Sequence, residues 1–389
     1  MSQLSQVFLQ GLETVLGQPK PFIPLHEPEF KGNEWELVKD CLDSTFVSSV
    51  GKYVDEFEVI LAEYTGARYA VAVVNGTAAL HIALILAGVK PGDEVLIPAL
   101  SFVATANAVA HCGAIPHFVD SEFETLGMDA QALDSYLQES SKSEGDELWN
   151  RVTGRRIAAV VPMHTYGHPV NMAALVDVAN KYSLPVIEDA AESLGSTYQG
   201  QHTGTFGQMG TLSFNGNKII TTGGGGAILT SDKEIARQAK HLTTTAKRSY
   251  DWDFFHDQVA WNYRLPNLNA ALGCAQMERL PNFLHRKRLL AQRYQEVFRE
   301  IEGIEFISEP KDCSSNYWLN TIRLEQPSFE VRDNLLTTAN DANYQCRPTW
   351  TLLNKLPMYS KCPCAPLPVV EKLEASLINV TSSAKFADN

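Results

Sequence analysis

The stretch "YAVAVVNGTAALHIALILAGV", residues 69–89, contains a short apolar run followed at once by a helical pattern. The apolar run ends at Asn75 and Gly76, and it is nearly continuous, which is typical of a strand covered on both faces. The helix expected from Thr77 to Gly88 is apolar on almost every side, so it is predicted to be buried. A buried strand that leads directly into a buried helix indicates an α/β fold.

The same rhythm of strand and helix continues outward from this stretch to about residue 230. Further strands are expected at "EVLIPAL" (94–100), "IPHFVD" (115–120), "IAAVVPMH" (157–164), "PVIEDAA" (185–191), "MGTLSF" (209–214) and "GGAILT" (225–230). With the first strand they predict a large domain built on a mainly parallel seven-stranded sheet. The polar, aperiodic segment 140–156 is expected to form an excursion on the surface.

The pattern of predicted strands and helices changes after about residue 265. Residues 268–301 predict a long helix that is bent or broken near Pro281, because proline lacks the amide that a helix interior needs. The remaining sequence mixes strands and short helices. We therefore expect two domains: a large α/β domain at 1–265 with an N-terminal arm, and a smaller α+β domain at 266–389.

Composition limits the classes of function. Of the 389 residues 44% are hydrophobic, and 32 basic against 45 acidic residues give a net charge of −13. That balance argues against a nucleic-acid partner but does not exclude an anionic small substrate, because a pocket can be locally positive. Seven scattered cysteines indicate reduced thiols, and the pair Cys362 and Cys364 does not predict a zinc site. Without a signal-like start or a membrane-length apolar run, we expect a soluble cytoplasmic protein with no metal.

The start of the buried helix is a candidate phosphate site. Its first amides point into the protein together with the Thr77 hydroxyl, and free amides and the helix dipole both favour an anion. A core helix that is simply capped by Thr77 explains the same residues equally well.

Two further residues carry candidate chemistry. Asp189 falls at the carboxyl end of an apolar strand, where parallel sheets bind ligands, and a buried carboxylate there needs a cationic partner or several donors. An ordinary helix N-cap is the alternative. Lys218 lies between a strand and four glycines, Gly223 to Gly226, and a lysine in a partly apolar pocket is a nucleophile that forms Schiff bases with aldehydes. Taken singly, it is more often a surface residue.

The combination indicates one cofactor, pyridoxal 5′-phosphate (PLP). The helix start would hold its phosphate, Asp189 would keep its ring nitrogen protonated, and Lys218 would condense with its aldehyde. A protonated ring withdraws electrons from the carbanion that forms when a substrate loses its α-proton. Phe102, at the end of another strand, could stack on the ring.

Five blocks of the sequence resemble the DegT-type aminotransferases, which are fold-type I PLP enzymes acting on nucleotide-linked keto sugars. The blocks are "NGTAALHIAL" (75–84), "PALSFVATANAV" (98–109), "VIEDAAESLGSTYQG" (186–200), "GTLSFNGNKIITTGGGGAILT" (210–230) and "NYRLPNLNAALGCAQMERL" (262–280). They occur in order, and the resemblance runs from about residue 22 to the "INVTSS" near the end.

The resemblance implies a role for each matching residue around the cofactor. Lys218 would be the Schiff-base lysine and the acid/base, Asp189 would hold the pyridinium, and Phe102 would cover one ring face. The phosphate site would be formed by Gly76, Thr77, Ala78 and Ser213.

Three positions have less defined roles by the same resemblance. Glu192 would lie near the phenolic oxygen of the cofactor, where a carboxylate would need to share a proton. Asn262 would reach the phosphate of a neighbouring subunit, which implies a homodimer with shared active sites. Arg264 could serve the substrate's diphosphate, although a salt bridge at the helix entry is equally compatible. His164 lies at a strand end facing the site, and a structural turn histidine is the preferred interpretation.

The resemblance also predicts the reaction. Dehydratase relatives carry histidine in place of the lysine, so Lys218 predicts transamination, with an amino-acid donor such as glutamate. The blocks "FIPLHEP" (22–28), "DSTFVSSVGKYVDEFE" (43–58), "TTTAKRSYDWDFFHD" (243–257) and "SNYWLN" (315–320) resemble the branch that aminates C4 of UDP-4-keto-6-deoxy-N-acetylglucosamine for legionaminate- and bacillosamine-type surface sugars. Amination at C3, or a non-catalytic binding or regulatory protein on the same fold, are the alternatives.

Overall fold

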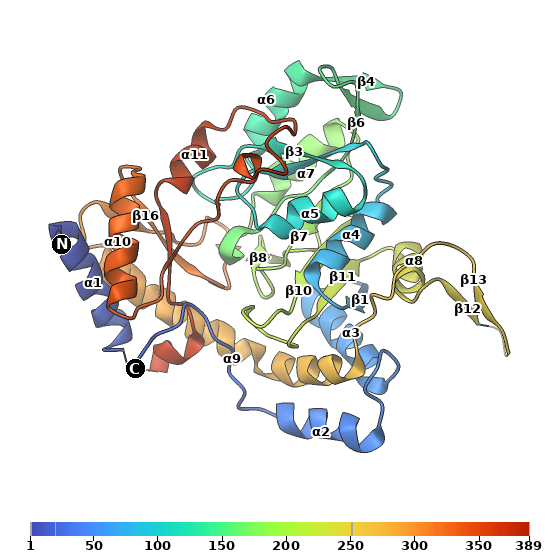
Figure 1. The fold of residues 1–389 in the computed structure, drawn as a ribbon, viewed down its shortest axis with the longest axis horizontal. Coiled ribbons are helices and arrows are strands. Elements are labelled where there is room, and N and C mark those ends of the chain that lie inside the picture. Colours follow the sequence, from blue (N-terminus) through green and yellow to red (C-terminus); the bar gives the residue numbers. More distant parts are fainter. Residues whose placement is uncertain (1, 20, 250–251, 389) are drawn as a thin grey trace.

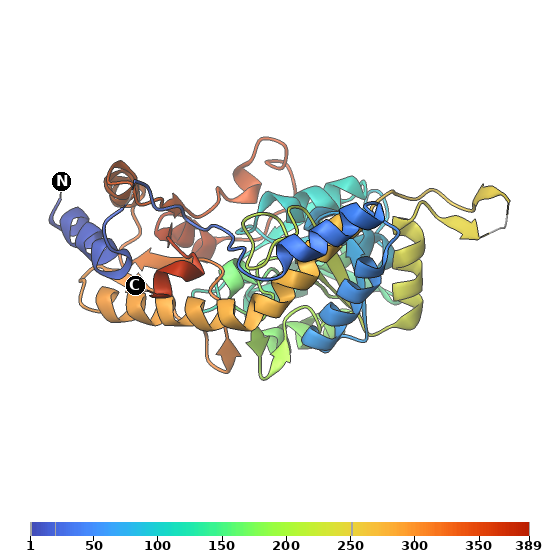
Figure 2. The same cartoon turned by 90° about the horizontal axis from the view of Figure 1, so that it is seen from below.

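The computed structural model describes residues 2–19, 21–249 and 252–388. Figure 1 shows an α/β part built around the central strands and a smaller part that contains α10 (Phe329–Asp341). The long helix α9 (Asn267–Phe298) runs along both parts, as Figure 2 also shows from below. This arrangement is the fold-type I architecture expected from the sequence.

The central strands form two sheets that parallel bridges join. One sheet has the order β1-β11-β10-β7, and the other begins β3-β2-β6. Bridges between Val160 and Val186 and between Met163 and Asp189 connect β6 to β7. The strands are β1 (Tyr69–Val73), β2 (Glu94–Pro98), β3 (Ile115–Val119), β6 (Arg156–Val160), β7 (Ile187–Asp189), β10 (Met209–Ser213) and β11 (Gly226–Thr230).

These are the seven strands predicted from the sequence, and the sheet is mainly parallel as expected. Only β11 runs antiparallel to its two neighbours, β1 and β10. Since β1 and β10 are both antiparallel to β11, they run in the same direction, and β10 is parallel to β7. The carboxyl ends of β1, β10 and β7 therefore lie at one edge, which is where parallel sheets bind ligands.

Helices around the strands bury their apolar sides against the sheet. The α/β part contains α2 (Glu34–Ser44), α3 (Lys52–Thr65), α4 (Gly76–Leu86), α5 (Val103–His111), α6 (Ala130–Ser140), α7 (Met172–Lys181), α8 (Lys233–Thr243) and the short helix η1 (Thr165–Gly167). The predicted buried helix is α4, in which Ala79, Ile82, Ala83 and Leu84 are inaccessible to solvent. It packs against β10 and β11, so its start is fixed relative to the ends of the strands.

The structure refines two expectations from the sequence. Segment 140–156 is largely exposed, as expected of a surface excursion, and it contains an ordered hairpin, β4 (Ser141–Glu144) and β5 (Glu147–Asn150), whose second strand pairs with β6. Helix α9 does not break at Pro281. The flanking Leu280 and Phe283 are buried in the core, so packing on both sides holds the helix although one amide is missing.

The smaller part is a four-stranded sheet with helices on it. The sheet order is β14-β16-β18-β17, from β14 (Ile304–Phe306), β16 (Asn320–Leu324), β17 (Arg347–Pro348) and β18 (Leu377–Val380). The C-terminal part of the chain also contains α11 (Pro368–Glu374), η2 (Leu353–Lys355) and η3 (Ala384–Asp388), and α11 and η2 contact the α/β part. Helix α1 (Gln3–Leu16) packs here, because Phe8 and Leu12 share a core with Leu290 and Tyr294. The chain's first helix therefore joins the C-terminal core, and the proposed domain division at residue 265 stays a prediction.

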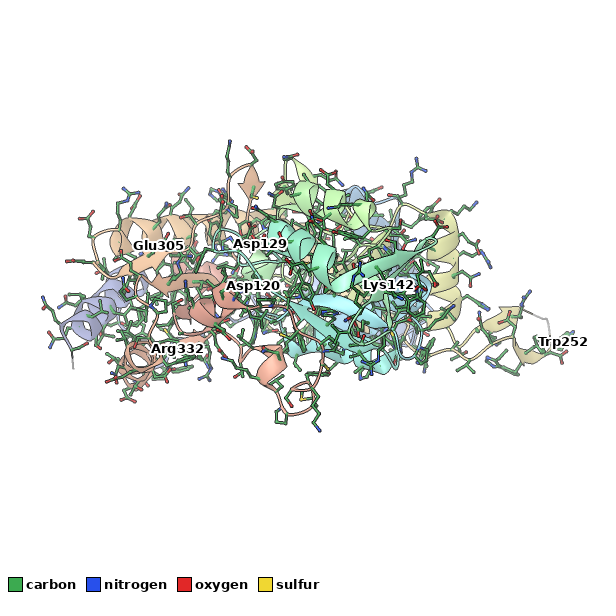
Figure 3. The ribbon with its side chains drawn as sticks, turned by 90° about the horizontal axis from the view of Figure 1, so that it is seen from above. Asp120, Asp129, Lys142, Trp252, Glu305 and Arg332 are labelled. Atoms are coloured by element: carbon green, nitrogen blue, oxygen red, sulfur yellow. The ribbon has the colours of Figure 1, made fainter. Side chains whose placement is uncertain are left out.

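Two small β structures lie outside the main sheets. Strands β8 (Thr197–Tyr198), β9 (Gln201–His202) and β15 (Cys313–Ser314) form one, and the hairpin β12 (Lys247–Ser249) and β13 (Phe254–His256) forms the other. The second hairpin projects away from the body, and Figure 3 shows Trp252 at its outer end. Trp252 is 93% exposed and Phe254 is 83% exposed. No helix in the described part of the chain is long and apolar enough to cross a membrane.

Candidate active site

A cavity of about 320 Å³ lies at the edge where β1, β7 and β10 end. It is lined by residues from both parts of the chain, among them Asn75, Gly76, Thr77, Phe102, Asp189, Glu192, Ser213, Lys218, Trp318 and Trp350. Seven of the residues predicted from the sequence therefore meet in one place. Ala78, Asn262 and Arg264 are not among the lining residues.

The side chain of Lys218 lies inside this cavity and not on the surface. The residue is 9% exposed, and the turn that carries it is closed by its amide, which donates to the carbonyl of Asn215 at 3.0 Å. Its Nζ lies 3.2 Å from Oε1 of Glu192 and 3.9 Å from the ring centroid of Trp318. A lysine amine with one carboxylate and one aromatic face as neighbours is placed to react with a bound aldehyde.

Asp189 is the last residue of β7 and is 3% exposed. Its Oδ2 accepts a hydrogen bond from Thr105 Oγ1 at 2.7 Å, and its Oδ1 accepts one from the Ala191 amide at 3.2 Å. Burial raises the pKa of this carboxyl, which the two hydrogen bonds and the charge of Lys218 oppose. Asp189 caps no helix, so the N-cap interpretation is wrong, and its buried charge suits a ligand cation such as a pyridinium.

Glu192 is almost fully buried between the amine and the backbone. Besides its contact with Lys218, its Oε2 accepts the amide of Tyr166 at 3.0 Å. Burial raises the pKa of this carboxyl from the ordinary 4.5 to about 7, although Lys218 and the Tyr166 amide lower it. Glu192 is therefore able to hold or release a proton near neutral pH, within reach of the Lys218 amine.

The start of α4 differs in one detail from the expectation. Asn75, and not Thr77, is the N-cap, and its Oδ1 accepts the Ala78 amide at 2.8 Å. The amides of Gly76 and Thr77 are left at the helix start without an intrahelical acceptor, and they face the cavity edge together with Ser213. The backbone here is close to β10, since a Cβ on Gly76 would lie 2.9 Å from the Ser213 Cβ.

Aromatic side chains from both parts of the chain complete the cavity, and Trp318 and Trp350 come from the smaller part. Phe102, which is 46% exposed, lies 6.2 Å from Trp350 between ring centroids, and Trp350 lies 4.9 Å from Tyr166. Trp318 covers Lys218. No pattern in the sequence marks Trp318 or Trp350 as a site residue, although Trp318 lies within the block "SNYWLN".

Arg264 and Asn262 lie away from the cavity lining. Arg264 is 8% exposed, forms an ion pair with Glu58 at 2.6 Å and donates to the Ala72 carbonyl at 3.0 Å. Because its guanidinium is used in this way, the structure favours the salt-bridge alternative over a substrate contact. Asn262 is exposed and forms a bridge with Thr244 near the β12-β13 hairpin. Its predicted role in a neighbouring subunit stays a prediction.

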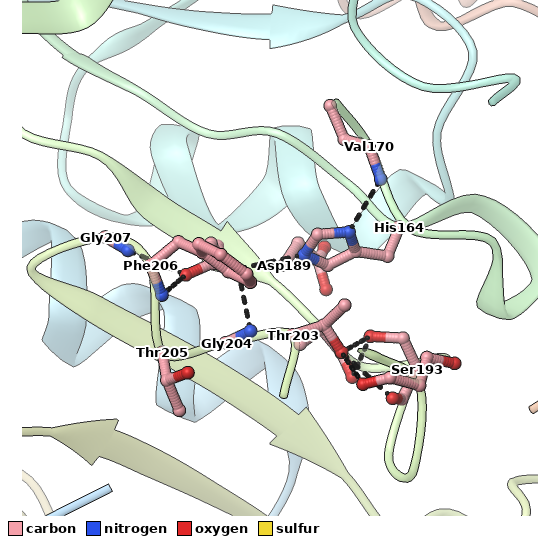
Figure 4. Close-up of polar contacts among 12 residues, drawn as sticks. His164, Val170, Asp189, Ser193, Thr203, Gly204, Thr205, Phe206 and Gly207 are labelled. Carbon is pink, nitrogen blue, oxygen red and sulfur yellow. Dashed lines mark hydrogen bonds and ion pairs between the residues drawn. The ribbon is translucent and has the colours of Figure 1, made fainter. Parts of the chain in front are cut away.

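His164 belongs to a buried network that fixes the strand carrying Asp189. Figure 4 shows its Nδ1 accepting the Val170 amide, at 3.1 Å, and its Nε2 lies 3.0 Å from Oε2 of Glu188. The same Glu188 carboxylate accepts amides from the loop drawn beside it in Figure 4, those of Gly204, Phe206 and Gly207, at 2.7–2.8 Å. His164 is thus a structural histidine, as preferred from the sequence. Glu188 lies inside an apolar strand sequence, and no motif marks it as a site residue.

The residues of the cavity fit PLP. Free amides and the Ser213 hydroxyl beside the close approach at Gly76 suit a phosphate, the Asp189 carboxylate suits a ring cation, and Lys218 suits an aldehyde. The fold and this site define a fold-type I PLP-dependent aminotransferase.

Comparison with known proteins agrees with this class. The chain belongs to the DegT/DnrJ/EryC1/StrS aminotransferase family, whose model matches residues 28–389. A protein of Escherichia coli O157:H7 named GDP-perosamine synthase is 37% identical over 340 residues, 87% of this chain and 88% of that protein. The putative pyridoxal phosphate-dependent aminotransferase EpsN of Bacillus subtilis (strain 168) is 36% identical, over 87% and 84%. The crystal structure of the aminotransferase TlmJ from Streptoalloteichus hindustanus is 27% identical, with a TM-score of 0.83 over 93% of each chain. The protein is therefore a PLP-dependent nucleotide-sugar aminotransferase.

Proposed function

We propose that this enzyme moves an amino group from an amino acid such as glutamate to C4 of a nucleotide-linked 4-keto-6-deoxy sugar. The observation that carries the proposal is the meeting of Lys218, Glu192 and Asp189 in one cavity at the carboxyl edge of the sheet. When bound, PLP supplies an aldehyde that accepts the amino group and an electron-withdrawing ring.

Each residue of the chain has a defined part in this proposal. Lys218 would bind the aldehyde and, when its Nζ is free, would move a proton to and from the reacting substrate carbon, while Glu192 would hold a proton beside that Nζ. Asp189 would pair with the ring nitrogen, and Phe102 would cover one ring face. The amides at the start of α4, with the Ser213 hydroxyl, would hold the phosphate. The Ala78 amide already donates to Oδ1 of Asn75, so a bond from this amide to the phosphate would be shared with that bond.

The sugar has two candidates. The sequence blocks around residues 22–28 and 43–58 support UDP-4-keto-6-deoxy-N-acetylglucosamine, for legionaminate- or bacillosamine-type surface glycans. The relationship to a protein named GDP-perosamine synthase supports a GDP-linked sugar instead. In either case the enzyme works as a cytoplasmic homodimer with both sites at the subunit interface.

The proposal is tested with the protein loaded with pyridoxamine phosphate. Mixing it with UDP- and GDP-linked 4-keto-6-deoxy sugars, and with the 3-keto isomers, is expected to change the cofactor's absorbance with one 4-keto sugar, and product NMR should place nitrogen on C4. Lys218→Ala is expected to lower turnover by about 10³-fold or more. In the PLP-loaded protein, borohydride reduction followed by peptide mapping should place the adduct on Lys218.

A 3-amino product would establish the C3 alternative. If turnover survives in Lys218→Ala, or the borohydride adduct maps to another lysine, the assignment of Lys218 is wrong. If no keto sugar reacts and the biological effect of the protein survives the same substitution, the non-catalytic alternative holds.

A further inference from the structure

A second cavity lies behind the segment that carries Lys218. It measures about 260 Å³, and Ile219 is one of its lining residues, whereas Asn217 and Lys218 line the active-site cavity. The segment 217–219 therefore borders both cavities. The second cavity is also lined by His26, Lys287, Ser383 and Lys385.

Lys287 is a buried lysine in the lining of this second cavity. It projects from α9, is 1% exposed, and donates from Nζ to the carbonyls of Trp318 at 3.2 Å and Ser382 at 2.5 Å. In the described part of the chain no carboxylate lies within ion-pair distance of it, and burial lowers its pKa to about 7. A buried amine without a counter-charge is costly. Ordinary core packing would be better served by an apolar residue.

The Trp318 carbonyl that Lys287 binds belongs to the residue that covers the active-site lysine. The Trp318 amide donates to Oδ1 of Asn316 at 2.7 Å, and its Nε1 donates to the Asn217 carbonyl at 2.6 Å. Its ring then lies 3.9 Å from the Nζ of Lys218. Trp318 is therefore held at its backbone on one side and touches both Asn217 and Lys218 on the other.

We propose that Lys287 is a positioning residue for Lys218 and acts through Trp318. By binding the Trp318 carbonyl, Lys287 fixes the position of the indole ring relative to Lys218. The ring, which also donates to the Asn217 carbonyl, then holds the Lys218 side chain against the Glu192 carboxylate. A four-carbon side chain has many rotamers, and a displacement of about 1 Å at a reacting atom lowers rates by up to about 100-fold. The inference rests on the proposed role of Lys218.

The main test is Lys287→Met, which keeps the length and bulk of the side chain but removes its donors. We expect kcat of the half-reaction with the amino donor to fall about 10- to 100-fold while KM for the donor stays within about twofold. In the cofactor-free protein, the rate at which an amine-reactive acylating reagent modifies Lys218, measured by peptide mass spectrometry, should change as well. Lys385→Met is the matched control, since Lys385 lines the same cavity, pairs with Glu27 and should leave both readouts unchanged.

Two further variants separate positioning from stability. Lys287→Arg keeps a donor and should restore most of kcat. Trp318→Phe keeps the ring but loses the bond to Asn217, so it should reproduce the loss, and the double variant with Lys287→Met should lose less than the sum of the two free-energy effects. If Lys287→Met does not fold, the comparison of Lys287→Arg and Lys287→Gln supplies the same readouts.

Loss of thermal stability in Lys287→Met with unchanged kcat and unchanged acylation of Lys218 would show a structural role only and overturn the inference. Fully additive effects of the two substitutions would also overturn it, because Lys287 would then not act through Trp318. If Lys218→Ala is inactive and Lys287→Met is unaffected, only this inference is wrong. If Lys218→Ala is active, the proposed function is wrong.

Discussion

At the scale of single residues, Glu192 shows how burial and ion pairing compete. It lies 3.2 Å from a lysine, which alone would lower its pKa, yet burial outweighs that contact and raises the pKa to about 7. The residue type was visible in the sequence, and so was the need to share a proton. The neighbours that set its behaviour, the Tyr166 amide and the Trp318 ring over Lys218, come from distant parts of the chain.

The raised pKa of Glu192 predicts a pH dependence of stability. Between pH 4.5 and about 7 the folded protein binds a proton that the unfolded chain has lost, so the free energy of unfolding falls as pH rises through this window. Glu192→Gln keeps an acceptor for the Tyr166 amide but cannot titrate. We expect the loss of stability from pH 5 to pH 8 to be smaller in this variant than in the wild type, by on the order of 2 kcal/mol.

The measurement is urea unfolding of both cofactor-free proteins at the two pH values. Every other titrating group is common to the two proteins, so the difference between them isolates Glu192. Equal pH dependence in the two proteins would show that Glu192 is ionised throughout and that its contact with Lys218 dominates.

Among the helices and strands, the sequence predicted those whose structure follows from a local apolar pattern. The seven central strands were recognisable because they are short, nearly continuous apolar runs, and α4 because it is apolar all round. The β4-β5 hairpin was not, since its residues are polar and its pairing with β6 is tertiary. Trp318 and Trp350 could not be placed in the site either, because only the packing of the smaller part brings them to Lys218.

Where two elements approach closely, a glycine becomes a testable requirement. A Cβ on Gly76 would lie 2.9 Å from the Ser213 Cβ, which is closer than side-chain carbons come, so Gly76→Ala must displace either the start of α4 or the end of β10. Both carry proposed phosphate contacts. We expect the affinity of the cofactor-free protein for PLP to fall about tenfold or more, which corresponds to at least about 1.4 kcal/mol.

Gly216→Ala is the matched control for this prediction. A Cβ at Gly216 would meet nothing within 4 Å, although the residue lies only two positions before Lys218. Fluorescence titration with PLP measures both variants. Equal affinities would show that the junction of α4 and β10 adjusts freely and that the phosphate contacts lie elsewhere.

The β12-β13 hairpin exposes large apolar side chains on the surface of the molecule. The hairpin projects from the body and exposes Trp252 and Phe254, and the exposed Asn262 lies at its base beside Thr244. Asn262 is not among the residues that line the cavity of its own chain. Both observations support the proposal that this region serves the active site of a second copy.

That proposal predicts complementation between two defective chains. Lys218→Ala and Asn262→Ala should each be weakly active alone. If Asn262 serves the neighbouring site, a mixed dimer contains one site with an intact Lys218 from one chain and an intact Asn262 from the other. Random reassortment of equal amounts makes about half the dimers mixed, each with one of two sites restored, so about a quarter of wild-type activity should return.

The experiment is co-expression with two affinity tags, followed by assay of the doubly purified dimer. That mixed dimer alone should have about half the wild-type activity, because one of its two sites is complete. If Asn262 acts within its own chain, both sites of the mixed dimer are defective and no activity returns. Recovery therefore depends on which chain supplies the asparagine, and a loss of folding in either variant is recognised beforehand because it prevents recovery of the doubly tagged dimer.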